Sequence, residues 1–136
     1  MSLSRVFLDA SCWIALRDRR EPWHGRARAV VKSLLSQRMQ FVFTSLVLAE
    51  THAHFSRSPR TRCQVLDDAQ GNPALHWEPV SSTDEAEAIR LLRQYEDKSY
   101  SFCDAVSFVV MRRLRVRKVA TFDDHFRQFG EFEVVG

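Results

Sequence analysis

The sequence predicts an α/β fold in which helices cover both faces of a mainly parallel, five-stranded sheet. Two observations support this prediction. Short runs that are apolar throughout, as in strands buried on both faces, alternate with longer segments of helical periodicity. No internal repeat or low-complexity linker interrupts the alternation. Strands and helices that alternate in this way are joined by right-handed crossovers into one layered sheet.

Length and composition agree with a single domain that spans residues 1–136. The chain has 136 residues, near the commonest size for one domain. Its hydrophobic fraction of 45% supplies enough apolar surface for a core, which excludes disorder as the main state.

The first half of the chain contains two candidate strands and the helices that follow them. Residues 6–8 form a short apolar run that ends at Asp9, and helical spacing begins at Trp13. An amphipathic helix is expected over 22–37. A second strand is expected at 41–43, followed by a helix over 46–55.

The second half continues the alternation. Its expected elements are a helix at 60–69, a turn at 71–73, a strand at 76–80, a helix from 82 to about 95, a helix at 101–115, a strand at 118–121, a helical turn at 123–127 and a strand at 132–135. Ser82 and Glu85, three residues apart, match the capping-box pattern for a helix start.

Cysteine spacing and hydropathy restrict the class of protein. The three cysteines lie at 12, 63 and 103, without the C-x-x-C spacing of a zinc or redox motif. A disulfide framework is therefore not expected. No apolar run is long enough for a membrane span or a signal peptide, so the expectation is a cytoplasmic protein with no membrane partner.

The basic residues are strongly biased towards arginine. Of 20 Lys+Arg residues, only Lys32, Lys98 and Lys118 are lysines. Arginine holds phosphate with a planar fork, so the bias suits nucleic acid, although codon bias is an equal alternative. The candidate phosphate contacts form three clusters, which could also merely solvate helix ends: Arg17, Arg19 and Arg20; Arg57, Arg60 and Arg62; Arg112, Arg113 and Arg115.

Four acidic residues fall where the chain leaves or approaches the expected strands. Asp9 closes the first strand, Glu50 lies on the helix after the second, Asp104 opens the helix before the fourth, and Asp123 follows the fourth. Ligands of parallel sheets bind at this carboxyl edge. Clustered carboxylates repel one another unless a cation joins them, and hard oxygen ligands suit Mg²⁺ or Mn²⁺. The chemistry that follows is metal-assisted phosphodiester hydrolysis.

Each acid also has a simpler explanation. Asp9 and Asp123 could only cap the helices that follow them. Glu50 and Asp104 lie among apolar residues, where an acid needs a partner. That partner could be an arginine or lysine side chain in a buried ion pair instead of a metal ion.

Several other residues carry weaker signals. His52 and His54 are about 200° apart around a helix axis, so they are expected at the surface rather than on one metal ion. Cys103 is expected in the core, and His125 is expected to have a polar role at a helix start. The larger aromatic residues could stack on bases, but core or subunit packing is the favoured interpretation for Trp13, Trp23 and Phe55.

Four stretches contain these acids: Phe-Leu-Asp-Ala-Ser at 7–11, Thr-Ser-Leu-Val-Leu-Ala-Glu-Thr at 44–51, Ser-Phe-Cys-Asp-Ala-Val-Ser-Phe at 101–108 and Ala-Thr-Phe-Asp-Asp-His-Phe at 120–126. Together they resemble the PIN-domain ribonucleases and, within them, the VapC-type toxins of bacterial toxin–antitoxin modules. The four occur in order and with family-like spacing over nearly the whole chain.

The resemblance implies a three-layer α/β/α sandwich and a Mg²⁺- or Mn²⁺-dependent endoribonuclease. It implies these site residues: Asp9, Asp104 and Asp123 on the metal, Glu50 as a fourth acid acting through water, and Ser11 and Thr121 as supporting hydroxyls. Asp124 adjoins Asp123, so the choice between them stays open. The implied partners are an RNA substrate, a VapB-like antitoxin and a second copy of the chain.

Two other functions compete with this one. A PIN-like module could hold RNA without cutting it, but such a module gains nothing from clustered negative charge. A phosphate-accepting signalling domain would need a second acid beside Asp9 and a lysine after a late strand. Asp9 is flanked by Leu8 and Ala10, and Lys118 precedes its strand, which argues against a signalling domain.

Overall fold

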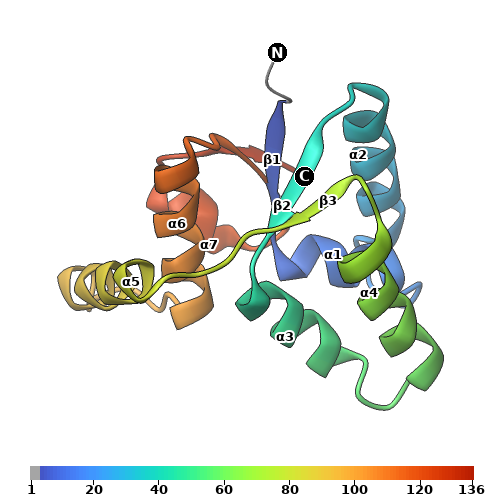
Figure 1. The fold of residues 1–136 in the computed structure, drawn as a ribbon, viewed down its shortest axis with the longest axis horizontal. Helices are drawn as coiled ribbons and strands as arrows, with labels where there is room; N and C mark the ends of the chain where they lie inside the picture. Colours follow the sequence, from blue (N-terminus) through green and yellow to red (C-terminus); the bar gives the residue numbers. More distant parts are fainter. Residues whose placement is uncertain (1–3) are drawn as a thin grey trace.

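The described residues form a sheet of five parallel strands in the order β3-β2-β1-β4-β5 (Figure 1). A computed structural model describes residues 4–136. The strands are β1 Arg5–Leu8, β2 Gln40–Phe43, β3 Leu75–Trp77, β4 Lys118–Ala120 and β5 Glu133–Val135. The predicted α/β class and parallel sheet are therefore confirmed.

Seven helices in the described residues cover the two faces of the sheet. The helices α1 Ala10–Arg17, α2 His24–Ser36, α3 Ser45–His54 and α4 Pro59–Gly71 connect β1 to β2 and β2 to β3. The helices α5 Ser82–Gln94, α6 Phe102–Leu114 and α7 Asp124–Phe129 belong to the later connections, which run in the opposite direction across the sheet. Because crossovers are right-handed, this reversal puts the two sets on opposite faces (Figure 1).

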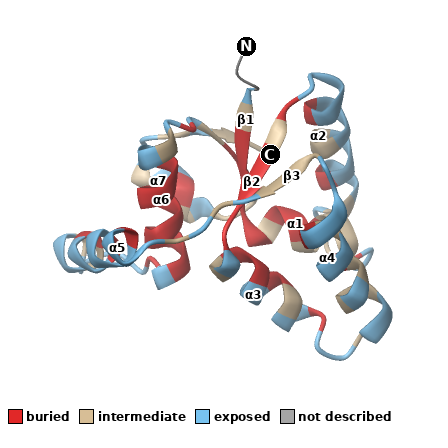
Figure 2. Ribbon diagram, in the orientation of Figure 1, coloured by how far each residue is buried: buried red, intermediate tan, exposed pale blue. Residues whose placement is uncertain are grey.

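The core lies around β1, β2, β4 and α6. Val6, Phe7, Val42 and Phe43 are fully buried, as short apolar strands between two helical layers must be. Helix α6 is buried along most of its length, whereas α5 packs on α6 and is largely exposed (Figure 2). The position of α6 matters for function because its first turn reaches the carboxyl edge of the sheet.

Three local predictions differ from the structure. The capping box of α5 pairs Ser81 with Asp84, not Ser82 with Glu85, so the box is set one residue earlier. The third strand ends at Trp77 rather than residue 80, since Pro79 has no N–H for a sheet ladder. The first helix begins at Ala10 because Asp9 caps it.

The cysteines are all free: Cys12 and Cys103 are buried and Cys63 is exposed. Within the described part of the chain, no helix is both long enough and apolar enough to cross a membrane.

Candidate active site

The candidate site lies where the strand order reverses. Strand β1 has β2 on one side and β4 on the other, and the two neighbours are reached by connections on opposite faces. A crevice forms at such a reversal, outside the carboxyl ends of the strands. Leu8 is in register with Ala120, which brings Asp9 beside Thr121 and the loop that leads to Asp123.

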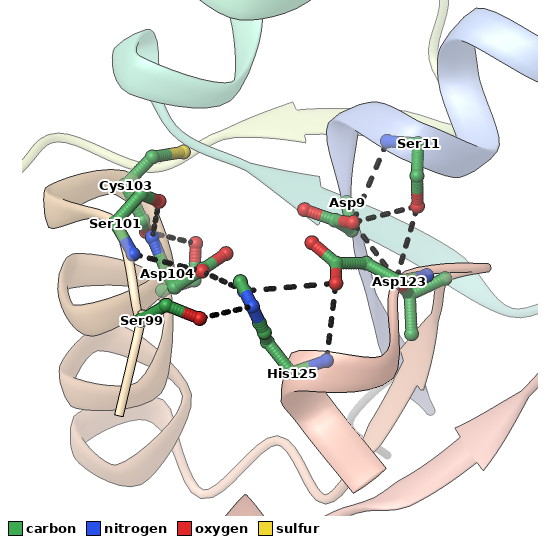
Figure 3. A network of polar contacts seen from close by, with 10 residues as sticks. Asp9, Ser11, Ser99, Ser101, Cys103, Asp104, Asp123 and His125 are labelled. Carbon is green, nitrogen blue, oxygen red and sulfur yellow. Dashed lines mark hydrogen bonds and ion pairs between the residues drawn. The ribbon is translucent and has the colours of Figure 1, made fainter. Parts of the chain in front are cut away.

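Asp9 is a buried carboxylate held by hydroxyl groups. It is 4% exposed, and its Oδ2 accepts hydrogen bonds from Ser11 Oγ at 2.7 Å and Thr121 Oγ1 at 2.8 Å (Figure 3). The pKa of Asp9 is raised to about 6: burial is the largest cause and the charges of Asp104 and Asp123 add to it, while the hydrogen bonds from the two hydroxyls oppose the rise. The ionised form of Asp9 is therefore destabilised in the folded protein, and a cation bound nearby would stabilise it.

The hydroxyls of Ser11 and Thr121 connect the first turn of α1 to the segment after β4. Their oxygens are 3.0 Å apart. Ser11 Oγ accepts from the Phe122 N–H at 3.0 Å, and Thr121 Oγ1 accepts from the Asp123 N–H at 3.0 Å. The network orients Asp9 and fixes the backbone that carries Asp123.

Asp104 reaches the same crevice from the start of α6. It forms a capping box with Ser101, in which Asp104 Oδ2 accepts from the Ser101 N–H at 3.0 Å. The same Oδ2 is 2.6 Å from His125 Nδ1. Asp104 is 5% exposed, so its local helix-capping role and its place in the crevice coincide.

Asp123 and His125 come from the start of α7. Asp123 caps this helix: its Oδ1 accepts from the His125 N–H at 3.0 Å and lies 3.6 Å from His125 Nδ1 (Figure 3). Asp124 is exposed in the first turn, so it is Asp123 that joins the cluster. Burial alone would lower the pKa of His125, but the hydrogen bond to Asp104 and the nearby carboxylates raise it.

Glu50 approaches the cluster from α3, although not as the sequence predicts. Helix α3 buries Val47, Leu48 and Thr51, which leaves Glu50 exposed rather than on an apolar face. Partial burial and the charge of Asp104 raise the pKa of Glu50. Burial and the charge of Glu50 also raise the pKa of Cys103, so this buried thiol is not an activated nucleophile.

The capping and ion-pair explanations are each only partly correct. Asp9 and Asp123 do cap helices, yet they also lie near one another, and the charge of Asp123 acts on Asp9 (Figure 3). Among residues 4–136, no lysine or arginine lies within ion-pairing distance of Asp9, Asp104, Asp123 or Glu50, and the one basic partner is His125. The spacing of the acids along the chain carried no sign of His125 in this role. Its position directly after the Asp123–Asp124 pair was the available signal.

Comparison with known proteins assigns the fold to a family. The sequence profile of the PIN domain matches residues 6–131. This chain belongs to the PIN-domain family. It is 33% identical over 131 residues to the 23S rRNA-specific endonuclease VapC20 of Mycobacterium tuberculosis, covering 95% of this chain and 97% of that protein. The predicted VapC-type resemblance is confirmed.

Solved structures agree with this assignment. The crystal structure of M. tuberculosis VapC20, a sarcin–ricin loop cleaving toxin, superposes with a TM-score of 0.83 at 28% identity, covering 95% of this chain and 98% of that one. FitAcB from Neisseria gonorrhoeae shares the fold, with a TM-score of 0.68 at 14% identity and 96% coverage of both chains. The three-layer PIN architecture is thus confirmed.

Two of the four predicted acids, Asp104 and Asp123, lie close enough to share a divalent cation, whereas Asp9 and Glu50 lie outside this group. Ligand atoms of Asp104, Asp123 and His125 all lie within 4.8 Å of one another. The hydrogen bonds to the carboxylate of buried Asp9 come from two neutral hydroxyls and the Ser11 N–H, none of which carries a charge that would compensate it. Carboxylate oxygens with one imidazole nitrogen form a donor set that divalent cations accept.

A second group of possible ligands, Asp18, Glu21 and His54, has a structural explanation. Asp18 is paired with Arg20 at 3.1 Å and with His54 Nε2 at 3.0 Å. Hydrogen bonds from Arg20 and His54 hold the pKa of Asp18 well below its usual range. The arginine already neutralises this acid, and His54 connects the end of α1 to α3.

The predicted arginine clusters divide into paired and unpaired members. Four members are paired with acids: Arg17 with Asp68, Arg20 with Asp18 at 3.1 Å, Arg112 with Glu131 at 2.7 Å and Arg113 with Asp84 at 2.8 Å. Among the described residues, no acidic group lies within ion-pairing distance of Arg19, Arg57, Arg60, Arg62 and Arg115. The paired arginines already use their charge within the protein and are weaker candidates for phosphate contacts.

The aromatic candidates also divide. Trp13 is 1% exposed and Phe55 is 3% exposed, so both belong to the core, as the favoured interpretation holds. Trp23 is 51% exposed and is not a core residue.

Proposed function

We propose that this PIN domain, as one domain over residues 1–136, is a divalent-metal-dependent endoribonuclease and the toxin of a VapBC-type pair. The observation that carries the proposal is the convergence of acids from four separate elements at the switch point of the sheet. They belong to a chain whose relative is named as an rRNA endonuclease.

The proposed metal ligands are Asp9, Asp104 and Asp123, with Glu50 acting through a water molecule. His125 lies in the same crevice, where its Nδ1 is 2.6 Å from Asp104 Oδ2 and helps to orient that carboxylate. The favoured ions are Mg²⁺ and Mn²⁺, which prefer carboxylate oxygens. When bound, such an ion supplies charge stabilisation at the phosphate and lowers the pKa of a coordinated water.

The protein groups have distinct proposed roles. Ser11 and Thr121 hold Asp9 through Oδ2, which leaves Oδ1 directed to other partners. The Ser101 N–H holds Asp104 in its capping box. Glu50, exposed and with a raised pKa, is suited to orient a water molecule and accept its proton. Fixed carboxylates need little rearrangement during the reaction, which favours the transition state.

The proposed partners follow from the relative. VapC20 is named for cleavage of 23S rRNA at the sarcin–ricin loop, so a structured ribosomal RNA is the first substrate to test. A toxin of this kind needs an inhibitor, and we propose a VapB-like antitoxin, a homodimeric toxin and a cytoplasmic location.

The decisive experiment incubates the protein with a synthetic RNA hairpin that carries the sarcin–ricin loop. Cleavage is expected with Mg²⁺ or Mn²⁺ and is expected to stop with EDTA. Asp104→Asn should bind the hairpin without cutting it. Binding without cleavage by the wild-type protein in both metals, and on a pool of other RNAs, would instead favour the catalytically weak RNA-binding module.

Expression in cells provides the second test. The chain alone should inhibit growth, and Asp104→Asn should not. Co-expression of a small DNA-binding protein encoded beside this gene should relieve the inhibition.

A further inference from the structure

Trp23 is an exposed aromatic side chain that the fold does not need to bury. It lies between α1 and α2, occupies the N-cap position of α2 and is 51% exposed. One face of its indole is stacked on the ring of Phe122, with centroids 5.4 Å apart and planes within 7° of parallel. Since Phe122 covers one face only, much of the remaining indole surface is open to solvent.

The Trp23–Phe122 pair is attached to the candidate active site. Phe122 directly precedes Asp123, and its backbone N–H donates to Ser11 Oγ, the hydroxyl that also holds Asp9. The pair is therefore fixed by the same network that positions two of the acids. A ligand on the free indole face would lie beside the crevice.

A cation accompanies the pair. Arg26 is three residues after Trp23, on the same side of α2, and donates to the Gly136 carbonyl at 3.3 Å. Gly136 in turn lies close to Phe122, since a Cβ added at Gly136 would be 3.4 Å from the Phe122 ring. In the described residues no Asp or Glu side chain lies within ion-pairing distance of Arg26, so its guanidinium adds a positive charge beside the indole.

We propose that Trp23, supported from below by Phe122, is a stacking platform for an unpaired nucleobase next to the scissile phosphate of the RNA, with Arg26 beside it for a neighbouring phosphate. The inference rests on the proposed nuclease function and adds a base-binding subsite to it. A flat aromatic ring with one free face binds any nucleobase, and RNA is recognised mainly through such unstacked bases. A role limited to holding the α2 start against the segment after β4 would not require half of the indole to be exposed.

The test is a double-mutant cycle between protein and RNA. In the inactive Asp104→Asn background, Trp23 is kept or changed to Leu or Phe. Each protein is titrated with the RNA that the wild type cleaves and with versions that carry one abasic nucleotide, moved stepwise across the cleavage site. Trp77→Leu is the matched control: Trp77 is 42% exposed, but it lies on β3, three strands from β4 and about 14 Å away across the sheet.

Trp23→Leu should weaken binding of the intact RNA by about 5- to 150-fold, the range of one base–aromatic stack. Trp23→Phe should restore most of the affinity. At one abasic position beside the cleavage site, the protein that keeps Trp23 and the Trp23→Leu variant should bind equally, because the base that stacks is gone. Trp77→Leu should show no such coupling. With the protein that keeps Trp23, the abasic RNAs alone should identify the same nucleotide by a loss of affinity. This measurement needs no substitution at Trp23, so altered folding of a Trp23 variant cannot explain it.

Two results would overturn the inference. If wild-type protein cleaves the RNA but Trp23→Leu binds as tightly as before, or loses affinity equally for every abasic RNA, the platform does not exist and the nuclease assignment stands. If the wild type neither cleaves nor binds RNA, the nuclease proposal is wrong, and so is the stacking platform that depends on it.

Discussion

Helices α5 and α6 begin with the same capping motif, yet the two motifs have opposite surroundings. Ser81 and Asp84 form the box of α5, and Ser101 and Asp104 form that of α6, each with both hydrogen bonds at 3.0 Å. The two aspartates are similarly buried, at 2% and 5% exposure.

What differs is the partner of each carboxylate. Burial by itself would raise the pKa of Asp84, but Arg113 donates two hydrogen bonds of 2.8 and 2.9 Å to it, and the net effect is a lowered pKa. Asp104 instead meets His125 and faces the carboxylates of Asp9 and Glu50. A capping box therefore fixes where a carboxylate lies, and its tertiary partner decides whether it closes an ion pair or remains available to a metal ion.

The largest contrast is expected in activity. Asp104→Asn should lower RNA cleavage by about a hundredfold or more, since it removes a charged metal ligand while the amide keeps a hydrogen-bonding group at the start of α6. Asp84→Asn, the matched substitution in α5, should change cleavage by less than about threefold. Comparing the two variants at saturating Mn²⁺, with metal affinity measured by calorimetry, checks this. Equal losses in both would contradict the distinction.

The next effect concerns an unpaired carboxylate and pH. The pKa of Asp9 rises from 3.8 to about 6 on folding, so folded protein binds a proton that unfolded protein releases between these values. Without metal, the wild type should lose up to about 3 kcal/mol of stability as pH rises from about 4 to 6.

Asp9→Asn lacks this titration and should be more stable than the wild type at pH 7 in EDTA. Urea unfolding of both proteins at several pH values measures the difference. If the free energy of unfolding of the wild type instead increases between about pH 4 and 6 relative to that of the variant, the predicted direction of the pH dependence is wrong.

Removing the ion pair at the capping box of α5 should lower the stability of the fold and leave RNA cleavage nearly unchanged. Asp84→Asn leaves Arg113 without its main counter-ion, and the expected loss is about 2 kcal/mol, reduced from that of a fully buried pair because Arg113 is partly exposed. Thermal unfolding measures it. Arg113→Gln should cost more than Asp84→Asn, because it leaves the buried carboxylate of Asp84 without its counter-ion.

The smallest expected effect is on RNA affinity, and it should differ between arginines that are paired with an acid and those that are not. In the Asp104→Asn background, Arg60→Gln should weaken RNA binding a few-fold and reduce the salt slope by about 0.7, the value for one contact with single-stranded nucleic acid. Arg112→Gln should leave the slope unchanged, because Glu131 already holds that side chain. Equal slopes for the two variants would remove the distinction between them.

Local pattern determined most of the architecture of this protein. Apolar runs such as Val6–Leu8 and Phe41–Phe43 are buried on both faces, and helix periods follow from nearby residues, so the parallel sheet and its carboxyl edge could be anticipated. The positions of Asp9 and Asp104 in the fold were predictable for the same reason, since each directly follows or begins an element.

Pairing across the chain was decided only by the tertiary structure. His125 meets Asp104 across 21 positions, Arg113 meets Asp84 across 29, and Arg17 meets Asp68 across 51. The preference for Asp123 over Asp124 and the exposure of Trp23 depend equally on what packs nearby. Hydrophobic periodicity is a property of neighbouring residues, whereas the partner of a charged or aromatic side chain depends on which distant segments the completed fold brings beside it.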